Sequence, residues 1–280
     1  ITFNGQLTMN KLGKRVDVLN AKQYKEYMDE TGFANIPESD AVDRTDWFDE
    51  TYQTGLSQNY MVSVSDGTEK TKYYLSAGYQ DDQGIIETSF FKRYTFRANV
   101  ESDVRKWLNV SANVSYADQS GAGAGPMGTG ANRGGTVLAT INTPTYAPVW
   151  STVAGEEGWY NTHFNGVNIT SPLENMAREK DNRNKENRLV ATGGLLFKFL
   201  PELTLKSSMS IDRISAINTA FINPTETKEG REQHGKGSDT RYQTTVLTFD
   251  NVLNYNKTFG KHSLDAMVGT SWTKCDYRWS

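Results

Sequence analysis

Polar and apolar side chains alternate without a break in Arg93-Tyr94-Thr95-Phe96-Arg97-Ala98-Asn99-Val100. Successive side chains of a β-strand point to opposite faces, so a period of two is typical of a strand with one apolar face. The same alternation predicts eight further strands, within residues 1–9, 59–65, 73–80, 108–116, 189–199, 203–212, 247–255 and 263–272. The chain is therefore predicted to be all-β and antiparallel.

The connections between the predicted strands alternate in length along the chain. Short turns are predicted at 66–70, 101–106, 200–202 and 257–262, and long connections at 13–55, 81–90, 117–186 and 213–240. An up-and-down barrel of the outer membrane has this rhythm, with tight periplasmic turns and long extracellular loops. A soluble sandwich has no reason to place all its long loops at one end. The pattern favours a transmembrane β-barrel.

Composition excludes several classes of protein. The net charge of −3 argues against nucleic acid as a partner, because phosphate binding requires a basic excess. No run of eighteen apolar residues is present, which excludes a transmembrane helix but not membrane-spanning strands. Aromatic residues make up 11% of the chain, which argues against disorder. The single cysteine, Cys275, cannot form an internal disulfide.

The two faces of the predicted strands differ in chemistry. One face carries side chains that need water or polar partners, and we expect these to face a water-filled lumen: Arg93, Arg97, Asn99, Asn109 and Asn113. The opposite face is apolar and is expected to face lipid at Val62, Leu75, Phe96, Val110 and Leu195.

One helix is expected in the first long connection. Asn20 can cap it, Gln23 completes a capping box, and Gly32 can end it. Tyr24, Tyr27 and Met28 would share a face. The glycine-rich run at 121–130 is expected to be a flexible loop segment.

Several motifs in the first half of the chain resemble a known family. They are Thr45-Asp46-Trp47-Phe48-Asp49-Glu50, Gln58-Asn59-Tyr60-Met61-Val62-Ser63-Val64-Ser65, Tyr73-Tyr74-Leu75-Ser76-Ala77-Gly78-Tyr79, Gly84-Ile85-Ile86, Phe91-Lys92-Arg93-Tyr94 and Lys106-Trp107-Leu108. Their order is similar to the early barrel region of SusC-like TonB-dependent transporters, with the closest match over 56–116. Ser171-Pro172-Leu173 is also similar, although the family usually has Asn where Ser171 stands.

The resemblance implies a larger barrel, of the plugged, 22-stranded kind. Residues 1–280 would then be a partial outer-membrane β-barrel domain, since the chain starts at Ile1 in a strand pattern and shows neither a signal peptide nor a plug. The implied function is TonB-dependent import of a bulky oligosaccharide or peptide across the outer membrane of a Gram-negative bacterium. The implied partners are a SusD-like surface lipoprotein and TonB, which would act through an N-terminal region absent here.

Two other classes share the strand pattern. One is a passive porin or an adhesion-type outer-membrane barrel, which would need no plug. The other is a soluble all-β glycan-binding module or a polysaccharide-cleaving enzyme.

The residues themselves offer little support for catalysis. The three histidines are isolated and have no metal-ligand spacing, and no Gly-x-Ser-x-Gly elbow is present. The sequence therefore predicts no enzyme activity, no metal and no cofactor.

Aromatic residues gather in the connection at 117–186. Exposed aromatic rings offer flat faces to sugars and anchors to protein partners. We expect substrate or lipoprotein contacts from Tyr146, Trp150, Trp159, Tyr160, His163 and Phe164. The alternative is that these side chains pack the long loop against itself.

Overall fold

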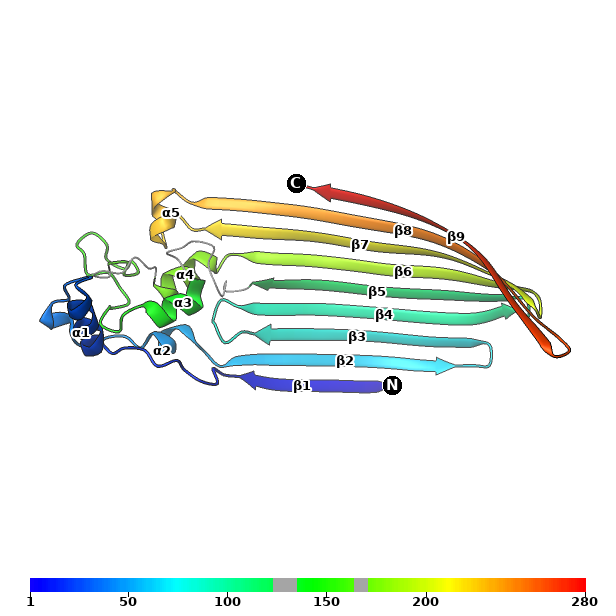
Figure 1. Ribbon diagram of the computed structural model, residues 1–280, viewed down its shortest axis with the longest axis horizontal. Helices are drawn as coiled ribbons and strands as arrows, with labels where there is room; N and C mark the ends of the chain where they lie inside the picture. The colour runs from blue at the N-terminus through cyan, green and yellow to red at the C-terminus, as the bar shows by residue number, and fades with distance from the viewer. Residues whose placement is uncertain (123–134, 164–170) are drawn as a thin grey trace.

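The computed structural model describes residues 1–122, 135–163 and 171–280. Within them the nine expected strands form one antiparallel sheet, and each strand pairs with its neighbours in the chain (Figure 1). The all-β prediction is confirmed. The strands are β1 (Thr2–Asn10), β2 (Gly55–Gly67), β3 (Thr71–Gln83), β4 (Phe90–Arg105), β5 (Leu108–Ala122), β6 (Arg183–Leu200), β7 (Leu203–Ile222), β8 (Lys236–Phe259) and β9 (His262–Trp279).

All the helical segments lie at one end of the sheet, here called the loop end, and the tight turns lie at the other (Figure 1). They are α1 (Ala21–Thr31), η1 (Glu38–Asp40), α2 (Trp47–Thr51), α3 (Gly135–Asn142), α4 (Pro172–Glu179) and α5 (Lys228–Glu232). The short and long connections that alternate along the chain therefore lie at opposite ends of the sheet.

Among the described residues, no helix is both long and apolar enough to cross a membrane.

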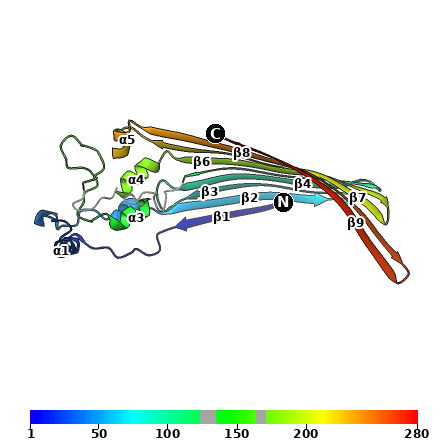
Figure 2. The same ribbon diagram turned by 45° about the horizontal axis from the view of Figure 1, so that its top comes forward.

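The sheet is twisted and curved. Figure 2 shows the hairpin of β8 and β9 projecting beyond the other turns. Twist of one hand is expected from the backbone of L-residues, and it accumulates across a sheet of many strands.

Three of the expected long connections are shorter than predicted, because the strands continue toward the loop end. The connection expected at 81–90 is 84–89, that at 117–186 is 123–182, and that at 213–240 is only 223–235. The reason is that both faces of these extensions carry polar residues, as in Asp212-Arg213-Ile214-Ser215 of β7. The hydrogen-bonded ladder continues there, but the alternation that reveals a strand in the sequence has ended.

The expected helix is α1, with the expected caps. The Asn20 side chain accepts a hydrogen bond from the backbone of Gln23, the Gln23 side chain accepts one from the backbone of Asn20, and Gly32 closes the helix with φ 66°. Tyr24 and Met28 share the inward face of α1, as expected. The prediction is wrong for Tyr27, because this residue is 53% exposed. Tyr27 lies about 100° around the helix from Met28, which turns it to solvent.

The main hydrophobic core lies at the loop end and not in the sheet. It joins α1 and α2 to a segment about a hundred residues later, and its buried members are Ala21, Met28, Ile36, Trp47, Tyr146 and Ala147. Backbone and side-chain hydrogen bonds fasten the two parts: Trp47 Nε1 donates to the Pro144 carbonyl at 2.9 Å, and Thr45 Oγ1 donates to the Ala147 carbonyl at 2.7 Å. Two long loops thus fold as one unit.

Replacing Trp47 with Ala should open this loop unit and leave the sheet intact. Trp47 is 2% exposed, and truncating a buried Trp costs about 3–5 kcal/mol. Hydrogen exchange should then accelerate in both 20–52 and 144–149, with unchanged heat-modifiable gel migration of the barrel. Phe33→Ala is the control, because Phe33 is 72% exposed and its loss should be nearly neutral. Faster hydrogen exchange confined to 20–52 would show that the two loops are not one unit.

Candidate functional site

Within the connection that carries the aromatic residues, residues 149–161 form a small hairpin at the loop end of the sheet. Trp150 and Tyr160 are joined by an antiparallel bridge, Ser151 N donates to the Trp159 carbonyl at 2.8 Å, and Asn161 N donates to the Val149 carbonyl at 2.9 Å. Gly155 and Gly158 adopt φ values of 87° and 76° at the tip, a region that favours glycine. The hairpin places Trp150 beside Tyr160, and their rings stack with centroids 4.9 Å apart.

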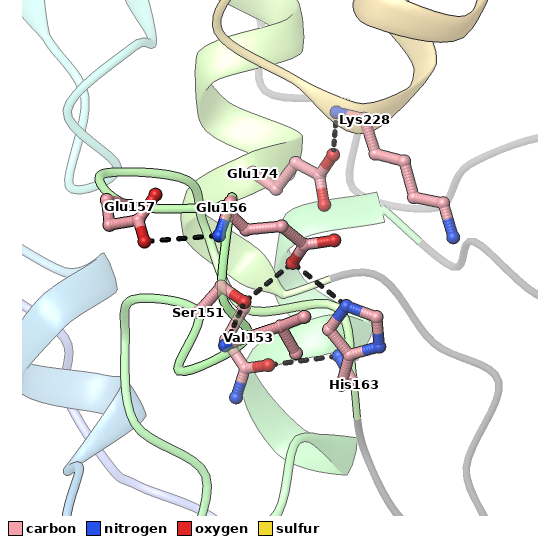
Figure 3. A network of polar contacts seen from close by, with 9 residues as sticks. Ser151, Val153, Glu156, Glu157, His163, Glu174 and Lys228 are labelled. Carbon is pink, nitrogen blue, oxygen red and sulfur yellow. Dashed lines mark hydrogen bonds and ion pairs between the residues drawn. The ribbon is translucent and has the colours of Figure 1, made fainter.

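A carboxylate in the turn of the hairpin holds two side chains. Glu156 Oε2 accepts a hydrogen bond from Ser151 Oγ at 2.6 Å and lies 2.9 Å from His163 Nε2 (Figure 3). The hydrogen bond from Ser151, the contact with His163 and the nearby charge of Arg231 lower the pKa of Glu156. The order of these groups differs from that of a nucleophile triad, because here the carboxylate, and not the imidazole, accepts the hydrogen bond from the hydroxyl.

Helix α4 is the second element of the site. The Ser171 side chain caps it by accepting a hydrogen bond from Glu174 N at 3.1 Å, and Pro172 occupies its first turn. This local sequence is a normal helix start. The helix presents the apolar side chains of Leu173, Met176 and Ala177 to a pocket.

Hydrogen bonds, ion pairs and a cation–π contact hold the connection between β7 and β8 against α4 and the hairpin. Glu174 Oε1 accepts a hydrogen bond from Lys228 N at 2.6 Å (Figure 3), and Arg178 pairs with Glu229 at 3.3 Å. A third pair joins Lys180 to Glu226.

The Lys180–Glu226 pair has a nitrogen–oxygen distance of 2.5 Å, and it raises the pKa of the lysine. One further contact reaches the hairpin: the Arg231 guanidinium lies 3.4 Å from the centroid of the Trp159 ring. Cation–π contacts of this kind add to the attraction between segments.

These elements surround a pocket of about 590 Å³, here called the loop-end pocket. Its walls come from the connection between β3 and β4, the hairpin, α4, the first residue of β6 and the connection between β7 and β8. The lining residues are Glu87, Thr88, Phe90, Trp150, Gly158, Tyr160, Leu173, Met176, Ala177, Lys180, Arg183, Thr225 and Glu226. Burial in this surrounding raises the pKa of the Tyr160 hydroxyl.

The structure separates the five described members of the group of six aromatic and histidine residues that the sequence placed together. Tyr146 is 4% exposed and packs on Tyr24 in the hydrophobic core, so it serves the loop itself. Trp159 is covered by Arg231, and His163 is held by Glu156. Of these five described residues, Trp150 and Tyr160 line the loop-end pocket.

The last of the six, Phe164, lies outside the described residues.

The pocket residues other than Trp150 and Tyr160 were not among the predicted site residues. The apolar positions Leu173, Met176 and Ala177 have the spacing of one helix face, so an amphipathic helix was detectable there. The charged residues of the pocket follow no such pattern in the sequence, because the packing of separate loops brings them together.

The five residues expected to face a lumen do share one face of the sheet. Asn99 and Asn113 are register partners, Asp103 is the partner of Asn109, and Arg93 and Arg97 have the same parity on β4. The five residues expected to face lipid lie on the opposite face, where Val110 is the partner of Leu195.

Acid should loosen the hairpin through Glu156. Its folded pKa lies below the ordinary 4.5, so its stabilising contribution is complete above pH 4.5 and is lost as the pH falls through the lower folded value. Protection factors from hydrogen exchange at 149–161 should therefore be constant above about pH 4.5 and fall as the pH drops below it. Glu156→Gln should be less protected at neutral pH and should show no such acid response. The same acid response in that variant would assign the effect to another group.

Comparison with known proteins places this geometry in context. No family model matches the chain. The chain is 26% identical to the TonB-dependent receptor SusC of Bacteroides thetaiotaomicron, over 96% of this chain and 28% of the relative. It is 27% identical to the TonB-dependent receptor P3 of Formosa agariphila, over 98% of this chain and 27% of the relative. The chain thus spans about a quarter of the length of the curated relatives it matches.

Solved structures share the fold. The chain superposes on the RagAB peptide transporter with a TM-score of 0.78 and 19% identity, over 98% of this chain and 34% of that one. The RagAB peptide importer in the open-open state gives a TM-score of 0.75 and 18% identity, over 99% and 38% of the two chains. The resemblance seen in the sequence motifs is confirmed: over most of its length the chain is similar to SusC and to other TonB-dependent receptors, and its described strands have the fold of part of the RagAB transporter chain.

Proposed function

We propose that this chain is part of an outer-membrane transporter that imports a bulky oligosaccharide or peptide with energy delivered through TonB. Residues 1–280 form part of its β-barrel, and a SusD-like surface lipoprotein assists at the loop end. The main support is an apolar band on one face of the sheet.

Residues that are paired across neighbouring strands form rows across the sheet, here called register rows. The apolar band crosses these rows obliquely. On β2 it runs over Tyr60–Val64 and has Val62 at its middle, whereas on β9 it runs over Leu264–Trp272 around Val268. The register row of Val62 reaches Asp276 on β9, so the band is displaced toward the turns as it crosses the sheet.

This displacement, about one residue per strand, has a simple geometric cause. Strands about 4.8 Å apart and tilted about 40° from a membrane normal meet a flat bilayer about 4 Å, or one residue, further along at each step. A soluble core sets no such flat boundary. The slope of the band is therefore what a bilayer crossed by tilted strands would produce.

The opposite face of the sheet suits water. Near the turns it borders a hollow of about 500 Å³ lined by polar side chains that include Lys72, Asn99, Glu101, Asn109 and Lys206. We assign this face to the lumen, together with Arg93, Arg97 and Asn113.

Further strands would complete the barrel. Among the described residues, β1 pairs only with β2 and β9 only with β8, which leaves two open edges. Unpaired backbone groups are costly in a bilayer, so spanning sheets close. We propose a barrel of about 22 strands, the size typical of plugged outer-membrane transporters.

The names of the relatives support import as the activity. SusC, P3 and the RagAB transporter are described as TonB-dependent receptors or as a peptide transporter. We assign contact with substrate or lipoprotein to Trp150 and Tyr160, because both line the loop-end pocket.

An Arg on the apolar face should be far more harmful than one on the polar face. Val100 and Asn99 are neighbours near the middle of the band on β4 and point to opposite faces. Val100→Arg should lower the free energy of unfolding by about 2–4 kcal/mol, and Asn99→Arg much less. Urea unfolding in lipid vesicles measures both. Equal costs, or a larger cost for Asn99→Arg, would count against a bilayer on the apolar face.

Uptake should require both this protein and TonB. Cells that lack either one should fail to take up the labelled oligosaccharides or peptides that wild-type cells import, and restoring the gene should restore uptake. The purified transporter should bring a surface lipoprotein with it. Uptake that survives loss of TonB would instead indicate a passive pore.

A further inference from the structure

We infer that a cationic patch on the apolar, outward face of β6 to β9 binds the phosphate groups of a lipid in the outer leaflet. The inference goes beyond import, and it rests on the proposed barrel, in which this face of the sheet meets lipid. Three properties carry it: the depth of the patch, its net charge and its weakly engaged side chains. The patch consists of Lys185 on β6, Arg213 on β7, Arg241 on β8, and Lys274 and Arg278 on β9.

The register of the four neighbouring strands places these side chains on one face (Figure 1). Lys185 pairs with Ile217, and Ile217 pairs with Arg241, so the three share a face. Arg278 pairs with Gln243, which lies two residues from Arg241 on β8. Side chains two residues apart on a strand point to the same face, so Arg278 joins the set.

The patch begins at the border of the apolar band. Arg213 and Lys274 are the next residues on that face after Ile211 and Trp272. The register row of Arg213 reaches Asp276 on β9, and the slope of the band, about one residue per strand, moves the equivalent depth to Lys274. Arg213 and Lys274 therefore stand at one depth in the proposed membrane, at the border between hydrocarbon and headgroups.

The patch carries an excess of positive charge on one side of the band. Asp239 and Asp276 lie among its five cations on the same face, which gives these seven residues a net charge of +3. At the turn end, the described strand residues of this face on β6 to β9 include one lysine, Lys257, and it pairs with Glu202 at 3.5 Å. The excess thus borders the leaflet at the loop end, and clusters of Lys and Arg attract anionic headgroups.

The protein itself engages these cations weakly. Arg241 and Arg278 each pair with an Asp two residues away on the same strand, at 3.5 and 3.4 Å. Such exposed pairs contribute little stability. The other three cations have no ion-pair partner among the described residues, although Arg213 donates to a side-chain amide at 3.2 Å.

One headgroup can contact the patch from two strands. β7 and β9 are two strand spacings apart, about 10 Å, so Arg213 and Lys274 flank a space of headgroup size. Arginine offers phosphate a pair of parallel hydrogen bonds, and lysine adds a point charge. A phosphate group would also relieve the repulsion among the cations.

The test measures binding to the purified full-length transporter in detergent by native mass spectrometry. The probes are phosphorylated lipid A, the same lipid without its phosphates, and inorganic phosphate. The phosphorylated lipid should bind at least tenfold more tightly than the dephosphorylated one. Joint substitution of Arg213→Gln, Lys274→Gln and Arg278→Gln should remove this difference.

A matched control removes the same charge from the opposite face of the sheet. Joint substitution of Arg93→Gln, Arg97→Gln and Lys206→Gln should leave lipid binding within about twofold of the wild type, because these residues face the proposed lumen. Heat-modifiable gel migration checks that both variants are folded.

Equal binding of the two lipids, or an equal loss in the lumen-face control, would overturn the assignment. Displacement of the lipid by millimolar inorganic phosphate would also overturn it, because the patch would then hold a free anion. Either result together with a large cost of Val100→Arg would refute the patch and leave the barrel standing. Equal costs of Val100→Arg and Asn99→Arg would refute the barrel itself.

Discussion

The hydrogen-bonded ladder between neighbouring strands is the constraint on which the rest of this molecule depends. The sheet is one layer thick, and both of its faces are largely exposed in the chain by itself. No hydrophobic core holds β2 to β3 or β6 to β7; backbone hydrogen bonds do so, in unbroken register over most of each strand. Such a sheet is stable where one face meets lipid, because no water competes there for the backbone groups.

The ladder also separates two kinds of folding within one chain. In the sheet, each strand contacts the next one in sequence, and the order never departs from β1 to β9. At the loop end the contacts are distant: Trp47 reaches Pro144, and Thr45 reaches Ala147. The sheet brings together the bases of loops far apart in sequence, and their apolar residues then bury one another in a local core.

Neighbouring aromatic residues have different roles because of the charges near them. Arg231 lies over Trp159 and uses it to fasten α5 to the hairpin, while Trp150, stacked on Tyr160, stays half exposed at the pocket. The ion pairs of Arg178 and Lys180 hold the same connection against α4. The pocket is therefore shaped by inter-loop contacts, and its walls come from several separate segments.

The sequence by itself determined the strands of the described residues, the two chemically distinct faces of the sheet, the gathering of the long connections at one end and the caps of α1, because these follow from local periodicity, from connection lengths and from capping residues. The sequence did not predict the ends of strands that become polar on both faces, as beyond Asp212, because the polar and apolar alternation that indicates a strand is then absent. It also could not separate Tyr146 from Trp150. Both are aromatic residues of one loop, and only packing against α1 buries the first and leaves the second at a pocket. Which loops meet was decided by the sheet beneath them, because the order of strands fixes which connections stand side by side.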